Sequence, residues 1–162
     1  MKKLIVCVLL FIFSFMFYLY TAPPGSIAYR DSGEMITVGY TLGIAHPPGY
    51  PLYSLLGKLA SLFPLSNIAY RINLISVISG ALCVTLCFLC LTYLIDLCPA
   101  LVTALFLCSA YLHWYLSIVP EMYSLNALFA LLLIYVCILH LTLSTFHQSL
   151  YLFSFIFGLG LG

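Results

Sequence analysis

Charged side chains are scarce in this sequence. Five lysines and arginines and four aspartates and glutamates make up 6% of the 162 residues, whereas hydrophobic residues make up 65% and the mean hydropathy is +1.20. A soluble globular domain usually carries about a quarter charged residues. A chain this short cannot hide so much apolar surface from water. The composition therefore excludes a soluble fold and predicts an integral membrane protein.

The sequence also lacks a strong net charge and the signatures of several enzyme classes. Its formal net charge is +1 and no basic stripe is present, so nothing points to nucleic acid as a partner. The motifs H-E-x-x-H, G-x-x-x-x-G-K-[ST] and G-x-S-x-G are absent, and His113, His140 and His147 do not have the spacing of metal ligands. Hydrolase, ATPase and zinc-dependent functions are therefore unsupported. We expect no cofactor, with the need for a divalent metal left open.

Seven cysteines are present, an odd number, and nearly all of them fall inside apolar runs. Cys87 and Cys90 form a C-x-x-C pair, which is the spacing of zinc and redox sites. The alternative is that they pack as small hydrophobic residues. The flanking sequence is continuously apolar and a thiolate there is costly, so the second interpretation is favoured.

Long apolar runs fill most of the chain. The first covers residues 4–21 and follows two lysines. A cleaved signal peptide is the alternative, but no cleavage site of small residues follows and the run is long for a signal, so we predict a signal anchor. The later runs cover residues 73–95, 100–118, 122–143 and 149–162. The pattern predicts an all-α polytopic membrane protein with about four to five transmembrane helices.

A long polar loop, residues 22–72, separates the first two runs. Its segment "HPPGYP" breaks any helix, because proline lacks an N–H group and disfavours helix in the residue before it. Before this segment, "SGEMITVGYTLG" predicts a short helix with Asp31 as the N-cap and Glu34 three residues on, as in a capping box. After it, "LYSLLGKLASLF" predicts an amphipathic helix at the membrane interface.

The links between the later runs are so short that they require antiparallel hairpins. The two lysines at the N-terminus favour a cytoplasmic start, which places the long loop and the segment "VPEMYS" on the extracytoplasmic side. Asp31, Glu34 and Glu121 then share one membrane face, and they share it in the inverted topology as well. We expect a multi-pass protein of a bacterial inner membrane or its equivalent.

The acids are the first candidates for chemistry. Asp31 and Glu34 lie on one face of a helical turn, where either can act as a general base, and Arg30 can lower a pKa that apolar surroundings raise. The structural alternative is the capping box. Glu121 follows Pro120 and is either a second carboxylate at the site or an ordinary helix start.

Further candidates could bind a substrate. The guanidinium of Arg71 suits a phosphate group, and Lys58 could neutralise one, although both residues could instead anchor the chain at the interface. His46 could donate to a phosphate or a sugar hydroxyl, or be an ordinary loop histidine. Tyr50 and Tyr53 could stack on a sugar or an isoprenoid, or serve as interface anchors.

These features describe an enzyme that acts on a lipid-phosphate substrate. They also describe a transporter of a lipid-phosphate or a sugar, and a structural membrane subunit that docks a partner through the loop. The residues alone leave these three classes open.

A longer pattern narrows the choice. The segments D-S-G-E, H-P-P-G-Y-P-L-Y and R-x-N-L-x-S, followed by "VPEMYSLNALF" and "FIFGLGLG", closely resemble a family of multi-pass proteins that was long labelled a domain of unknown function. That family includes eukaryotic protein O-mannosyltransferases and belongs with the GT-C glycosyltransferases. The match is dense over residues 29–80.

The resemblance implies a GT-C-like helical core with its site at the extracytoplasmic face. It implies a polyprenyl- or dolichyl-phosphate sugar as donor, a protein or glycan as acceptor, and transfer with inversion. An acid of the first outer loop would be the catalytic base, which implies Asp31, with Glu34 as its partner. Arg30, His46, Tyr50, Tyr53, Arg71 and Glu121 would contact the substrate.

The same resemblance implies a larger protein. GT-C enzymes generally have more transmembrane helices than this chain, and the last apolar run stops at residue 162. We therefore expect the chain to be an N-terminal fragment whose activity alone is in doubt.

Overall fold

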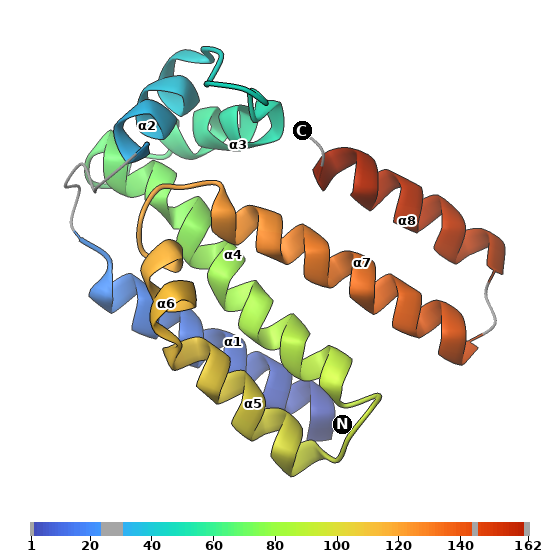
Figure 1. The fold of residues 1–162 in the computed structure, drawn as a ribbon. Coiled ribbons are helices and arrows are strands. Elements are labelled where there is room, and N and C mark those ends of the chain that lie inside the picture. The colour runs from blue at the N-terminus through green and yellow to red at the C-terminus, as the bar shows by residue number, and fades with distance from the viewer. Residues whose placement is uncertain (1, 24–30, 144–145, 161–162) are drawn as a thin grey trace.

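The computed structural model describes residues 2–23, 31–143 and 146–160, and every regular element among them is an α-helix (Figure 1). The helices are α1 (Lys2–Thr21), α2 (Ser32–Thr41), α3 (Pro51–Ser61), α4 (Ile68–Leu91), α5 (Leu97–Ser109), α6 (Tyr111–Ser117), α7 (Tyr123–Leu143) and α8 (Phe146–Gly160).

Three of these helices, α1, α4 and α7, are long and apolar enough to cross a membrane. The pair α5 and α6 makes a fourth if it is counted as one span, and the apolar part of α8, Ser149–Gly160, is shorter. A polytopic all-α membrane protein is therefore confirmed. The two short helices α2 and α3 form where the long loop was predicted to contain them.

The predicted span 100–118 falls on two helices, α5 and α6. The chain bends by 62° between α5 and α6, where Ala110 has extended backbone angles. Neither proline nor glycine marks this position, so the cause lies in tertiary contacts. The indole of Trp114 donates to the Thr21 hydroxyl at 2.9 Å, and the His113 ring contacts the Gly80 carbonyl oxygen at 3.2 Å. The bend directs α6 toward these partners on α1 and α4.

Helix α4 begins and ends earlier than predicted from hydropathy, which gave 73–95. Asn67 is its N-cap, and the side-chain oxygen of Asn67 accepts from the backbone N–H of Tyr70 at 2.9 Å. The extra turn at the start carries Arg71, so this residue lies on a helix and not in a loop.

Helix α4 lies at the centre of the fold, with α1 on one side and α7 on another (Figure 1). One hydrophobic core joins α1, α4, α5 and α6. The Tyr18 hydroxyl is buried in it and donates to the Cys108 carbonyl oxygen at 3.0 Å. A second, smaller core joins α2 and α3 to α4 and to the start of α7, with Met35, Tyr53 and Ile72 fully buried.

All seven cysteines are free thiols. In the described ranges, no group of three or more histidine, cysteine, aspartate or glutamate side chains is placed to hold a metal ion.

Candidate functional site

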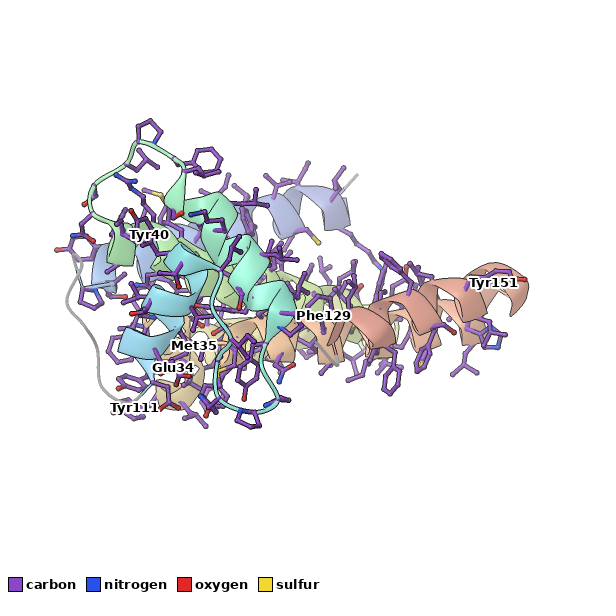
Figure 2. The ribbon with its side chains drawn as sticks, turned by 90° about the horizontal axis from the view of Figure 1, so that it is seen from above. Glu34, Met35, Tyr40, Tyr111, Phe129 and Tyr151 are labelled. Carbon is purple, nitrogen blue, oxygen red and sulfur yellow. The ribbon has the colours of Figure 1, made fainter. Side chains whose placement is uncertain are left out.

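The acids of the long loop lie at one end of the helix bundle. Helices α2 and α3 cover the ends of α4 and α7 there, and the N-terminus and the turn between α4 and α5 lie at the opposite end (Figure 1). Asp31 is the N-cap of α2 and Glu34 lies in its first turn, while Glu121 lies two residues before the start of α7. Figure 2 shows Glu34 at this end of the molecule and Tyr151 far from it.

Glu34 binds His46 with both carboxylate oxygens. Its Oε1 accepts from the backbone N–H of His46 at 2.7 Å, and its Oε2 lies 2.8 Å from the Nδ1 atom of the imidazole ring. Each side chain is 38% exposed, so the pair lies at the surface of the site and is open to a ligand. Glu34 thereby fixes both the backbone and the ring of His46.

The turn after His46 supports the same geometry. The backbone N–H of Gly49 donates to the His46 carbonyl oxygen at 2.9 Å, and Gly49 has φ +102°, which favours glycine. The next residue, Tyr50, is the N-cap of α3. Its ring meets the imidazole edge-on, with centroids 5.5 Å apart at 72°. The turn in the "HPPGYP" segment thus fixes the position of the His46 ring.

The contact changes the titration of both partners. The hydrogen bonds from His46 hold the pKa of Glu34 below its ordinary value. The pKa of His46 is raised, first by its hydrogen bond to Glu34 and then by the negative charges of Glu34, Asp31 and Glu121. Three carboxylates therefore act on one imidazole, and they favour its protonated form.

The predicted capping box is not formed. Asp31 occupies the N-cap position of α2, but its side chain makes no capping hydrogen bond, and Glu34 turns to His46 instead. Across the described part of the chain, the Asp31 carboxylate has no hydrogen-bond or ion-pair partner. A carboxylate without a described partner thus lies beside the engaged Glu34.

Glu121 connects the loop to the transmembrane core. It is 2% exposed, and its Oε1 accepts from the Ser32 hydroxyl of α2 at 3.2 Å. Its main chain is held by Ser76 of α4, whose hydroxyl donates to the Glu121 carbonyl oxygen at 3.0 Å and accepts from the Glu121 N–H at 3.2 Å. Helix α7 begins at Tyr123, so Glu121 is not part of its first turn, and Glu121 instead joins α2 to α4.

A cavity of about 70 Å³ lies between α3, α7 and α8. Tyr50 and Tyr53 line it together with Met122, Asn126 and Phe129. Tyr53 is 1% exposed. Burial and the nearby Glu121 carboxylate raise the pKa of its hydroxyl, which stays protonated. Tyr53 thus lines the cavity as a buried residue, and the partly exposed Tyr50 lines its edge.

The basic residues are engaged elsewhere. The guanidinium of Arg71 donates to the backbone carbonyl oxygens of Ser61 at 2.9 Å and Ser66 at 2.8 Å, and also to that of Leu65. Lys58 donates to the Tyr40 carbonyl oxygen at 2.8 Å. Arg30 lies outside the described residues. Arg71 and Lys58 therefore hold the α2–α3–α4 unit together.

Two residues of the site, Ser32 and Ser76, had no role predicted from the sequence. The signal for Ser76 lies in the R-x-N-L-x-S pattern, whose three named polar residues all contact neighbouring segments. The Asn73 side-chain amide donates to the Ile118 carbonyl oxygen at 2.7 Å. Ser76 holds Glu121, and Arg71 holds the link between α3 and α4. Ser32 carries no comparable signal, because serine is a common residue of a helix start.

Comparisons with known proteins give a consistent result. Residues 31–162 match the family described as "Protein O-mannosyl-transferase TMEM260 N-terminal domain". The mouse protein O-mannosyl-transferase TMEM260 is 43% identical over 112 residues, which cover 68% of this chain and 16% of that protein. A Dictyostelium discoideum protein O-mannosyl-transferase tmem260 is 32% identical over 156 residues, which cover 93% of this chain and 19% of that protein.

The chain thus spans less than a fifth of the length of these relatives. No solved structure matches it.

Proposed function

Because the chain belongs to the family of the protein O-mannosyl-transferase TMEM260 N-terminal domain, we propose that it forms the helical core of a membrane glycosyltransferase that moves a sugar from a lipid-phosphate donor to a hydroxyl of an acceptor. The donor we propose is a polyprenyl- or dolichyl-phosphate sugar, with mannose as the first candidate. The acceptor is a protein or a glycan. The names of the relatives support O-mannosyl transfer, and the membrane fold supports a donor that is itself anchored in the bilayer.

Asp31 is the proposed general base. The observation that carries this proposal is that the two loop acids differ in their contacts. Both carboxylate oxygens of Glu34 contact His46, whereas the Asp31 carboxylate has no partner among the described residues. The Asp31 carboxylate would take the proton of the acceptor hydroxyl as that oxygen attacks the anomeric carbon. The bond between that carbon and the phosphate oxygen breaks, and the polyprenyl phosphate leaves with the electron pair. Attack from the opposite face inverts the anomeric centre.

The buried residues Glu121 and Tyr53 would hold the residues around Asp31 in place. The buried Glu121 fixes α2 through Ser32, and so it fixes the start of the helix that carries Asp31. General-base catalysis typically contributes about 10²–10⁴-fold, and it depends on such positioning. We further propose that this end of the bundle faces the extracytoplasmic side, because Lys2 and Lys3 lie at the opposite end and favour the cytoplasm.

The rival function is transport of a lipid-phosphate or a sugar without chemistry. The test uses the full-length protein that contains this chain, reconstituted in vesicles with a panel of polyprenyl-phosphate sugars and peptide or glycan acceptors. The expected result is a new glycosidic bond of inverted configuration and release of polyprenyl phosphate. Movement of the lipid across the bilayer without any glycosidic product, or no consumption of any donor, would overturn the proposal.

A further inference from the structure

Glu34 has a role that differs from that of a base. A carboxylate that acts as a base needs an oxygen open to the incoming hydroxyl. Both oxygens of Glu34 are bound by His46, one through the main chain and one through the ring. A hydrogen bond from Nδ1 to a carboxylate sets the orientation of an imidazole and leaves its Nε2 atom facing outward. The Nε2 atom has no partner among the residues that the structure describes.

Among the described residues, His46 is a basic group that this end of the bundle can offer to an anion. Lys58 and Arg71, the other basic residues described near this end, donate to backbone carbonyl oxygens. The groups that face His46 are the carboxylates of Glu34, Asp31 and Glu121, together with the Tyr50 ring. The three negative charges stabilise the imidazolium ion, in which Nε2 carries a proton to donate.

The surroundings of Tyr50 fit an amphiphilic ligand. The Tyr50 ring packs on His46 and also lines the cavity of about 70 Å³. That cavity shares Asn126, Phe129 and Gly160 with a mostly apolar groove of about 360 Å³ between α7 and α8. Helices α7 and α8 lie side by side, and the pair extends away from the α2–α3 end (Figure 1). A charged head beside His46 and an apolar chain along this groove would match the two ends of one ligand.

We propose that Glu34 is a positioning residue, which holds His46 so that its Nε2–H group binds a phosphate oxygen of the lipid-linked donor. This inference rests on the proposed function, and it adds the division of work between the two loop acids. Asp31 contacts the acceptor, and His46, held by Glu34, contacts the donor. A hydrogen bond from a charged donor to a phosphate is roughly twice as strong as a neutral one.

The test measures the KM for polyprenyl-phosphate mannose and the inhibition constant of polyprenyl phosphate as functions of pH, in the full-length protein. For the wild type we expect both constants to rise as the pH increases through the pKa of His46, because the imidazolium loses its charge. His46→Gln keeps a neutral donor near the position of Nε2. It should raise both constants about ten- to a hundred-fold and abolish their dependence on the His46 titration.

Glu34→Gln separates positioning from mere stability. The imidazolium loses its carboxylate partner, so the pH at which both constants rise should move downward. Asp96→Asn, at the opposite end of the bundle, is the matched control and should leave both constants and their pH profiles unchanged. If Glu34→Gln or His46→Gln keeps the wild-type pH profile, the inference is wrong.

Other outcomes are equally decisive. An activity that rises with pH and collapses in Glu34→Gln at an unchanged KM would make His46 a proton acceptor and overturn the inference. If the wild type transfers no sugar, the proposed function fails. In that case binding of polyprenyl phosphate to the reconstituted protein is measured directly as a function of pH. Binding that depends on pH and is lost in His46→Gln still supports the His46 contact. Binding that does not depend on pH, or that His46→Gln retains, overturns it.

Discussion

The hydroxyl of Ser76 on α4 exchanges two hydrogen bonds with the main chain of Glu121, one in each direction, at 3.0 and 3.2 Å. Both residues are buried. This relationship fixes the link between α6 and α7 to the central helix, and it places the Glu121 carboxylate under α2. The candidate site is therefore built on a transmembrane helix, although its acids lie in loops and short helices.

Replacing Ser76 by alanine should damage the site through this contact. Ser76→Ala leaves the buried N–H and carbonyl groups of Glu121 without these partners, which costs about 1–3 kcal/mol for an unsatisfied buried group. We expect lower thermal stability and a lower rate of sugar transfer. Ser79→Ala is the control, because Ser79 is buried on the same helix and its hydroxyl makes no described hydrogen bond. Equal losses in the two variants would contradict this account of Ser76.

The contact between Glu34 and His46 should make the stability of the loop depend on pH. The folded-state pKa of His46 is raised, so its contribution is complete below the ordinary value of 6.5 and is lost as the pH rises through the folded-state pKa. The pKa of Glu34 is lowered, so its contribution is complete above 4.5 and is lost as the pH falls through the folded-state pKa. The pair should therefore be most stable between these limits.

Hydrogen exchange of the His46 amide, corrected for its intrinsic pH dependence, measures this effect directly. Protection should be greatest in the mildly acidic range and should decline on both sides of it. Glu34→Gln should remove this profile, since the amide nitrogen of glutamine cannot form an ion pair. A protection profile that is flat with pH in the wild type would show that the contact is not formed in solution.

The close approach of α2 and α3 predicts a steric effect. A Cβ atom added at Gly57 would lie 2.7 Å from the Cα atom of Gly39, which is backbone and cannot turn away. Gly57→Ala should separate the two helices and lower the unfolding free energy by about 1–3 kcal/mol, as overpacking typically does. Gly158→Ala, which meets no atom within 4 Å, should be neutral or slightly stabilising. Thermal unfolding in detergent compares them, and a neutral Gly57→Ala would contradict the close packing of α2 on α3.

Arg71 separates a structural role from a substrate role. Its guanidinium reaches three carbonyl oxygens around the link between α3 and α4, and the single ammonium group of a lysine cannot reproduce this fork. Arg71→Lys should therefore lower stability by about 1 kcal/mol. The KM for the lipid donor should stay within about twofold. A large rise in that KM at unchanged stability would instead support the phosphate contact that the sequence predicted for Arg71.

The fold class could be predicted from the sequence because hydropathy is a strong and local signal. Spans such as α1 and α7 could be predicted to within a few residues for this reason. The bend at Ala110 could not, since it arises from contacts of Trp114 and His113 with α1 and α4, far away in the chain. The capping box failed similarly. Local spacing favoured a bond from Glu34 to its own helix, but the carboxylate found a stronger partner 12 residues away.

The residues of the candidate site could be predicted from the sequence, but the contacts between them could not. Asp31, Glu34, His46 and Glu121 could be named because charges are rare in this chain. Which acid would be engaged and which open depends on the fold of the "HPPGYP" segment, and no periodic pattern encodes it. The burial of Glu121 was likewise invisible, because the same Pro-Glu pair also begins ordinary helices.

The most direct test of Asp31 as the base compares Asp31→Asn with Asp96→Asn in the full-length protein. Both substitutions remove one carboxylate, but only Asp31 lies at the candidate site. We expect Asp31→Asn to lower sugar transfer from polyprenyl-phosphate mannose by about 10²-fold or more, while the protein stays inserted and still binds polyprenyl phosphate. Asp96→Asn should transfer at the wild-type rate. Undiminished transfer by Asp31→Asn, with the product formed at the same site, would contradict the assignment of Asp31 as the base.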